Sequence, residues 1–172
     1  MLNHAAQVIR LMIFDVDGVM TDGSLYYSDN GDEIKAFNSL DGHGIRMLED
    51  SGVEVAIITG RQSKLVANRA ANLKIKHVYQ GSGDKGATFA ELLDVTGYKA
   101  EECGYMGDDV IDLPVMTRVG FAVSVPNAPE FVRRHAHYVT TARGGHGAVR
   151  EACETIMAAQ GTLEGVLAGY LR

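Results

Sequence analysis

Short runs of apolar residues recur along the chain and alternate with longer amphipathic stretches. The apolar runs predict strands over residues 8–16, 53–58, 77–80, 103–106, 119–125 and 137–140. The stretches between them predict helices over 42–51, 62–73, 86–96, 109–117 and 128–135, followed by two more over 147–157 and 163–171. This alternation predicts an α/β fold built on a doubly wound, mainly parallel sheet with right-handed crossovers.

One segment departs from the alternation and predicts a small β-hairpin. Residues 25–27 and 33–37 are strand-like and flank Ser28-Asp29-Asn30-Gly31, a turn that contains Asn-Gly. We expect this hairpin to overhang the loop after the first strand. The intervals 18–58 and 62–84 hold too little else for a second folded unit, so residues 1–172 are expected to form a single domain with a C-terminal tail over 142–172 and no large cap domain.

Composition and charge narrow the class of protein. The chain has 172 residues, 46% of them hydrophobic and 22% charged, which suits one compact α/β domain. A net charge of -6 argues against nucleic acid as a partner. There is neither a run of about 18 apolar residues nor a signal-like N-terminus, so we expect no membrane partner and a cytoplasmic location. Cys103 and Cys153 alone indicate neither a zinc cluster nor a disulfide framework.

The first strand leads into two closely spaced carboxylates. Asp15-Val16-Asp17-Gly18 follows the apolar run of residues 11–14, where an open α/β sheet places its binding site. Two such carboxylates are costly unless a cation lies between them, and Mg²⁺ usually takes one or two carboxylates together with water and phosphate oxygens. Taken by itself, the motif is more often a plain turn than a catalytic site, so its interpretation depends on other motifs. An EF-hand loop fits poorly because Val19 stands at its fifth position.

Three further polar motifs follow apolar runs downstream. Thr59-Gly60-Arg61 offers a hydroxyl, an unobstructed N–H and a guanidinium, and Lys85 lies in Gly83-Asp84-Lys85-Gly86 before a helix. Gly107-Asp108-Asp109 follows the next strand, with Asp112 one helical turn beyond Asp109. Each motif alone could be a turn, a surface charge or a helix cap. Together, at one edge of a sheet, they predict a site for a metal-bound phosphate.

In this order, the four motifs resemble those of the haloacid dehalogenase superfamily of phosphatases. The segments 15–23, 37–42, 58–61 and 142–147 further resemble sugar-acid phosphatases of lipopolysaccharide precursor synthesis within it, which act on an eight-carbon ulosonate phosphate. Enzymes for a nine-carbon ulosonate phosphate remain an alternative. The resemblance implies a Mg²⁺-dependent phosphoric monoester hydrolase with a haloacid dehalogenase-like fold.

The resemblance also implies the catalytic roles. Asp15 would be the nucleophile that forms an aspartyl-phosphate, and Asp17 would protonate the leaving alkoxide and later activate water. Thr59 and Lys85 would stabilise the oxygens of the transferring phosphoryl group.

The same resemblance implies the metal ligands. Mg²⁺ would be held by the carboxylates of Asp15 and Asp108 and the main-chain carbonyl of Asp17. Either Asp109 or Asp112 would orient this shell.

An anionic substrate on an acidic protein must be met by local cations, for which the candidates are Arg61, Arg69, Lys85, Arg143 and Arg150. One departure from the resemblance is Leu40, which stands where relatives tend to carry a basic residue. The residues that the resemblance implies as substrate contacts are Asp17, Asn38, Ser39, Leu40, Asp41, Gly42, Gly60, Arg61, Arg69, Lys85 and Arg143.

Two regions are expected to act between subunits or at the surface. Because an isolated hairpin is marginal in water and no large cap covers the site, the resemblance implies a homotetramer in which the hairpins associate. The glycine-rich segment 144–147 is expected to be flexible and to point outward. It would carry Arg143 toward a phosphate or a sugar carboxylate, with a plain connector as the alternative.

Two other classes of protein are compatible with parts of the sequence. Residues 81–86 match the G-x-G-x-x-G dinucleotide fingerprint, although no acidic residue obviously takes the ribose role. A phosphorylated signalling receiver also combines Asp, Thr and Lys, but it should lack a second acid two residues after the acceptor, where this chain has Asp17.

Overall fold

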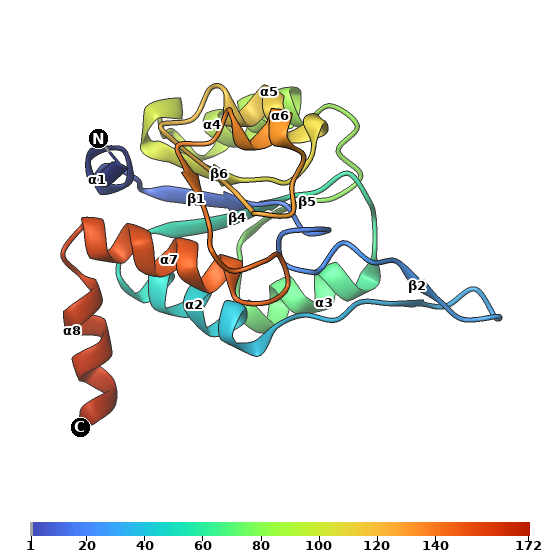
Figure 1. The fold of residues 1–172 in the computed structure, drawn as a ribbon, viewed down its shortest axis with the longest axis horizontal. Coiled ribbons are helices and arrows are strands. Elements are labelled where there is room, and N and C mark those ends of the chain that lie inside the picture. The colour runs from blue at the N-terminus through green and yellow to red at the C-terminus, as the bar shows by residue number, and fades with distance from the viewer. Residues whose placement is uncertain (1) are drawn as a thin grey trace.

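A computed structural model describes residues 2–172, and at its centre lies a six-stranded sheet whose neighbouring strands are all parallel. The strands lie in the order β5-β4-β1-β6-β7-β8 (Figure 1). Their bounds are β1 (Leu11–Phe14), β4 (Glu54–Ile58), β5 (His77–Tyr79), β6 (Cys103–Met106), β7 (Phe121–Ser124) and β8 (Tyr138–Val139). The prediction of a doubly wound parallel sheet is confirmed.

Helices cover both faces of this sheet. In Figure 1, α4, α5 and α6 lie above it, whereas α2, α3 and α7 lie below it. Their bounds are α2 (Ser39–Asp50), α3 (Lys64–Leu73), α4 (Lys85–Thr96), α5 (Leu113–Met116), α6 (Glu130–Arg133) and α7 (Ala148–Ala159). Side chains fix several of the starts: Asn38, Ser63 and Asp84 each accept a hydrogen bond from a backbone N–H in the first turn of α2, α3 and α4.

The remaining helices lie near the two ends of the chain or are single turns. They are α1 (Leu2–Gln7), α8 (Leu163–Ala168) and the 3₁₀ turns η1 (Ala100–Glu102), η2 (Val110–Asp112) and η3 (Gly169–Leu171). The hydrophobic pattern does not predict α1, and it predicts a first strand that starts at residue 8, whereas β1 starts at Leu11. Tertiary packing explains the difference, since α1 packs on α7 and the Gln160 amide donates to the Ile9 carbonyl at 2.7 Å.

The predicted hairpin is present and projects from the body of the molecule (Figure 1). It consists of β2 (Tyr26–Tyr27) and β3 (Glu33–Ile34), which pair antiparallel. Tyr26, Tyr27 and Ile34 are exposed. The hairpin therefore presents apolar side chains to its surroundings.

The glycine-rich segment before α7 differs from its prediction. It is packed against the loop after β1 instead of pointing outward as a flexible tail: Gly145 N donates to Val19 O at 3.0 Å, and a Cβ on Gly144 would overlap the Gly18 carbonyl. The face of α7 that includes Ala152 and Ile156 is fully buried in the core. Residues 142–159 are thus part of the folded body. Within residues 2–172, no helix has the length and apolar character required to cross a bilayer.

Candidate active site

The carboxyl ends of β1, β4 and β6 and the start of α4 meet at a cavity of about 240 Å³. The structure brings together here all five residues to which the sequence assigned a catalytic or metal-binding role. The lining consists of Asp15, Asp17, Gly23, Leu25, Thr59, Gly60, Arg61, Lys85, Asp108, Asp109 and Ile111.

Asp15 is the first residue after β1, and its side chain is only 7% exposed. Its N–H donates to Met106 O at 3.0 Å, which ties it to β6. Val16 N donates to Oδ1 at 2.7 Å, and Lys85 Nζ lies 3.0 Å from the same oxygen. The contacts described for this carboxylate fall on Oδ1, so the lone pairs of Oδ2 remain for a ligand.

Gly18 and Thr21 shape the loop that carries Asp17. Thr21 Oγ1 accepts hydrogen bonds from Gly18 N and Gly23 N, at 3.3 and 3.2 Å. Gly18 has a φ of 87°, and a Cβ at this position would overlap the carboxylate of Asp108. Glycine is therefore needed both for the backbone conformation and for the close approach of the loop to Asp108.

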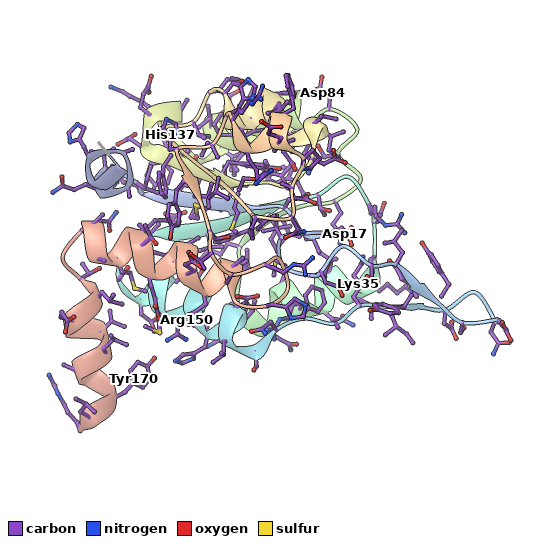
Figure 2. All side chains as sticks on the ribbon, in the orientation of Figure 1. Asp17, Lys35, Asp84, His137, Arg150 and Tyr170 are labelled. Carbon is purple, nitrogen blue, oxygen red and sulfur yellow. The ribbon has the colours of Figure 1, made fainter. Side chains whose placement is uncertain are left out.

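The Asp17 side chain pairs with cations at the base of the hairpin. Lys35 Nζ lies 2.5 Å from Asp17 Oδ1, and Arg61 Nε lies 3.8 Å from Oδ2. Figure 2 shows the labelled Asp17 and Lys35 near each other where the hairpin joins the body. Burial alone would lower the pKa of Lys35, but the hydrogen bonds and charges of Asp17 and Glu33 raise it above its usual value. The Lys35 ammonium is therefore charged at neutral pH.

Lys85 is a buried cation at the floor of the cavity. It begins α4, directly after the cap Asp84, and its side chain is 2% exposed. Its Nζ lies 3.0 Å from Asp15 Oδ1 and 2.6 Å from Asp112 Oδ1, and it donates to Tyr105 Oη at 3.3 Å. Burial would lower the pKa of Lys85, but the charges of Asp15 and Asp112 raise it. A positive charge is thereby fixed beside Asp15.

Asp112 supports both this lysine and the loop after β6. Its Oδ1 is 2.6 Å from both Lys85 Nζ and Tyr105 Oη, and its Oδ2 accepts from Asp108 N at 3.0 Å and Asp109 N at 3.1 Å. Asp109 is exposed, and its Oδ1 accepts from Val110 N. Of the two acids that could orient the site, the geometry favours Asp112.

The acidic groups at this floor fit a divalent cation. Asp15, Asp108 and Asp112 each offer an oxygen within 4.8 Å of the others. Burial, then the charge of Asp112, raises the pKa of Asp15 to about 7; burial, then the charge of Asp15, raises that of Asp108 to about 8. A cation would relieve this crowding. Because the oxygens of Asp112 already accept four hydrogen bonds, Asp15 and Asp108 are the carboxylates available to it, in keeping with the ligand habit of Mg²⁺.

Only some of the predicted substrate contacts line the cavity. Gly60 and Arg61 do, besides Asp17 and Lys85. Asn38 instead caps α2 by accepting from Asp41 N at 3.0 Å, and Ser39 and Leu40 are exposed. Arg69 donates to Asn38 O at 3.3 Å, and its guanidinium lies over the Phe37 ring.

The remaining three predicted substrate contacts, Asp41, Gly42 and Arg143, lie between helices or on the surface. Asp41 is buried, and its Oδ1 accepts from Arg150 N at 3.0 Å, so it caps the start of α7 from α2. A Cβ on Gly42 would overlap the Arg69 guanidinium, so Gly42 permits close packing of α2 on α3. Arg143 is exposed. For Asn38 to Gly42, Arg69 and Arg143, contact with a substrate remains a prediction.

Two residues of the site, Lys35 and Tyr105, are not among those predicted from the sequence. Lys35 was assigned only to the hairpin strand, although the period of two along that strand puts it on the same face as Glu33 and opposite the exposed Ile34. Tyr105 was regarded only as part of a buried strand. Alternation along the hairpin could have indicated Lys35, whereas the contact of Tyr105 with Asp112 depends on the fold.

A larger hollow of about 430 Å³ lies at the opposite end of the sheet, where β4 and β5 begin. Several of its charged side chains pair with one another: Arg46 donates to Glu49 at 2.8 Å, and His77 Nε2 lies 3.5 Å from Glu54. Among the described residues that line it, none is a buried carboxylate or a buried lysine like those at Asp15 and Lys85. Size alone therefore does not identify the functional site here.

The fold and the site are those of a haloacid dehalogenase-like hydrolase, and that family matches residues 74–151. A 3-deoxy-D-manno-octulosonate 8-phosphate phosphatase of Yersinia pestis is 52% identical over 91% of this chain and 84% of its own length. The enzyme of the same name from Escherichia coli (strain K12) is 50% identical over 92% of this chain and 85% of its own length. The chain belongs to the family of the 3-deoxy-D-manno-octulosonate 8-phosphate phosphatases.

A solved structure extends this comparison to ligands. The enzyme of the same name from Moraxella catarrhalis, in complex with magnesium ion, phosphate ion and KDO, superposes with a TM-score of 0.96. It is 42% identical and covers 98% of this chain and 97% of its own. The predicted resemblance to haloacid dehalogenase phosphatases and the predicted haloacid dehalogenase-like fold are thus confirmed.

Proposed function

We propose that this protein hydrolyses 3-deoxy-D-manno-octulosonate 8-phosphate to the free sugar acid and phosphate, in lipopolysaccharide precursor synthesis. The observation that carries the proposal is the convergence of Asp15, Lys85 and Asp108 on one small cavity, with Asp17 at its side. The choice of this ester as the substrate is supported by the names of the relatives, which specify it.

With these residues, the proposed reaction has two displacement steps at phosphorus. In the first, a carboxylate oxygen of Asp15 attacks phosphorus, the bond from phosphorus to the sugar oxygen breaks, and Asp17 gives a proton to that oxygen. In the second, Asp17 takes a proton from water, the water oxygen attacks phosphorus, and the bond to Asp15 breaks. Thr59 and Lys85 would offset the charge on the phosphoryl oxygens in both steps.

Mg²⁺ is the proposed cofactor. Asp15, Asp108 and the main-chain carbonyl of Asp17 would hold it, and when bound it neutralises phosphoryl charge. The crowding of the Asp15 and Asp108 carboxylates supports this proposal, as does the magnesium ion in the Moraxella complex.

We also propose a homotetramer located in the cytoplasm. The exposed hairpin residues Tyr26, Tyr27 and Ile34, together with Leu25 at the cavity, form an apolar surface that a neighbouring copy would cover. Sedimentation of the purified protein tests the subunit number.

The dinucleotide alternative finds less support. In the glycine-rich segment 81–86, Asp84 caps α4, and Lys85 pairs with Asp15 and Asp112. This segment therefore serves the phosphate site.

The test is phosphate release from a panel of esters, with Mg²⁺ and with a chelator. The panel contains 3-deoxy-D-manno-octulosonate 8-phosphate, a nine-carbon ulosonate 9-phosphate, glucose 6-phosphate and p-nitrophenyl phosphate. We expect Mg²⁺-dependent release with the highest kcat/KM for the octulosonate ester. A preference for the nine-carbon ester would make that ester the substrate in place of the octulosonate. No phosphate release from any ester would overturn the proposed function.

A further inference from the structure

Lys35 occupies an unusual position for a hairpin residue, because its ammonium is buried beside the acid that faces the leaving group. Its side chain is 2% exposed, and Nζ lies 2.5 Å from Asp17 Oδ1 and 3.1 Å from Glu33 Oε1. A lysine side chain is rarely buried unless it is paired. The buried Lys35 ammonium therefore needs a carboxylate in contact with it.

The other cations near the cavity are paired mainly with groups other than Asp17. Lys85 is bound between Asp15 and Asp112 at the floor. Arg61 donates to Tyr27 Oη and lies 3.6 Å from Glu33, which joins it to the hairpin. Arg69, outside the lining, donates to Asn38 O. Lys35 is thus the cation that contacts the catalytic acid most closely among the described residues.

Lys35 does not itself line the cavity, but it lies directly behind Asp17, which does. This place determines which part of a substrate the ammonium can meet. The phosphoryl group must lie against Asp15 and Lys85, whereas the leaving oxygen faces Asp17. A cation that contacts Asp17, and not Asp15, lies on the leaving-group side. In an ulosonate phosphate, this is the part of the molecule that carries a second anionic group, the carboxylate.

We propose that Lys35 is a specificity-determining residue that binds the carboxylate of the sugar-acid substrate. In the free protein, the Lys35 ammonium is paired with the carboxylates of Asp17 and Glu33. When the ester binds, its carboxylate also contacts this ammonium. The four-carbon stem of a lysine allows this change without movement of the hairpin backbone. Leu40 is exposed and carries no charge, and the segment 38–42 contains no cationic side chain.

This inference rests on the proposed function, and its test separates the two. The substrates are 3-deoxy-D-manno-octulosonate 8-phosphate and its C1 methyl ester, which differ in one negative charge. The proteins, all as the intact oligomer with Mg²⁺, are the wild type, Lys35→Met, Lys35→Arg, and Lys64→Met as an exposed control. The wild type should prefer the acid to its methyl ester by about 100-fold in kcat/KM, the effect typical of truncating one partner of a buried charge pair.

In Lys35→Met, this discrimination should fall to within about threefold, because the ammonium and the carboxylate act through one interaction. Lys35→Arg should restore at least part of it, and Lys64→Met should retain all of it. A discrimination that persists in Lys35→Met, with both substrates slowed equally, would show that Lys35 only positions Asp17, and would overturn the inference.

Two further outcomes are decisive. A wild type that releases no phosphate from the acid overturns the proposed function and the inference together. If Lys35→Met does not fold, Lys35→Gln, which keeps a donor without the charge, replaces it, and unchanged discrimination there would again overturn the inference.

Discussion

The surroundings of Asp15 destabilise the ionised form of its carboxyl group. Burial and the charge of Asp112 raise its pKa to about 7, although Lys85 acts in the other direction. Replacing Asp15 with Asn removes the proposed nucleophile and the buried charge but keeps the size of the side chain. We expect steady-state phosphate release to fall by at least about 1,000-fold, while the melting temperature of the metal-free protein at pH 8 stays the same or rises.

Thermal unfolding and turnover of the same purified sample check both parts. Circular dichroism that matches the wild type serves as the control for folding. Retained turnover would disprove the assignment of Asp15 as nucleophile.

Asp112 and Asp109 differ in what they support, although they lie three residues apart. Asp112 is fully buried and bonds Lys85, Tyr105 and the backbone N–H of Asp108. Asp112→Asn keeps the volume but replaces one acceptor by a donor, so it leaves buried donors without partners. We expect it to lower the free energy of unfolding by about 3 kcal/mol and kcat by at least about 100-fold.

Asp109→Asn is the matched control. Its carboxylate is exposed and accepts from Val110 N, a cap that Asn also provides, so we expect a change within about 0.5 kcal/mol. Denaturant titration and steady-state kinetics measure both variants. Equal losses in the two would show that the burial of Asp112 is not what matters.

At the scale of elements, periodicity and strand ends were enough to predict the sheet. Each apolar run that predicted a strand contains one. The central strands β1, β6 and β7 are near-continuous apolar segments because they are buried on both faces, whereas the edge strands β5 and β8 are only half-buried. The five residues with predicted catalytic or metal roles meet because carboxyl ends of parallel strands share one edge. The side chains of Lys35 and Asp41 could not be placed in this way. Their partners, Asp17 and Arg150 N, come from elements that only the fold brings together.

The loop after β1 is supported by an element that is distant in the sequence. Gly144 lies so close to Gly18 and Thr21 that a Cβ would overlap the Gly18 carbonyl. Gly144→Ala must displace the loop that carries Asp17. We expect a loss of about 2 kcal/mol of stability and a fall in kcat of at least about tenfold, since small displacements of catalytic groups are costly.

Gly165→Ala, in α8, is the corresponding control because, apart from its chain neighbours and the backbone of its own helix, no atom of the described residues lies within 4 Å of the added methyl group. It should leave kcat unchanged and raise stability slightly, as alanine is the better helix former. Denaturation curves and kcat of the two variants test whether the contact of Gly144 with the loop positions Asp17. A Gly144→Ala protein with wild-type kcat would mean that the contact does not position Asp17.

At the scale of the whole molecule, a negatively charged protein concentrates carboxylates at the site of a negatively charged substrate. The net charge is -6. Asp15 and Asp108 are forced close together at the floor by the parallel sheet, and Lys85 offsets only part of their charge. The folded state without a cation therefore holds an unfavourable cluster, which links stability, pH and metal binding.

The sign of that linkage follows from the two raised pKa values. Asp15 and Asp108 titrate at about 7 and about 8 in the folded protein, against a usual 3.8. Between these limits the folded state holds protons that the unfolded state has released. The contribution of these two groups to the stability of the metal-free protein is therefore fully present below about pH 4 and is lost as the pH rises through the folded pKa values. Mg²⁺ needs the deprotonated carboxylates, so its stabilising effect should grow over the same window.

We therefore expect Mg²⁺ to raise the melting temperature by several degrees at about pH 8.5 and by little at about pH 5.5. Thermal unfolding of the chelator-treated protein, with and without Mg²⁺ at both pH values, measures the effect. Asp108→Asn removes one of the two carboxylates and should flatten both the pH dependence and the response to Mg²⁺. An equal increment at the two pH values, or a larger one at the lower pH, would show that these carboxylates do not bind the cation.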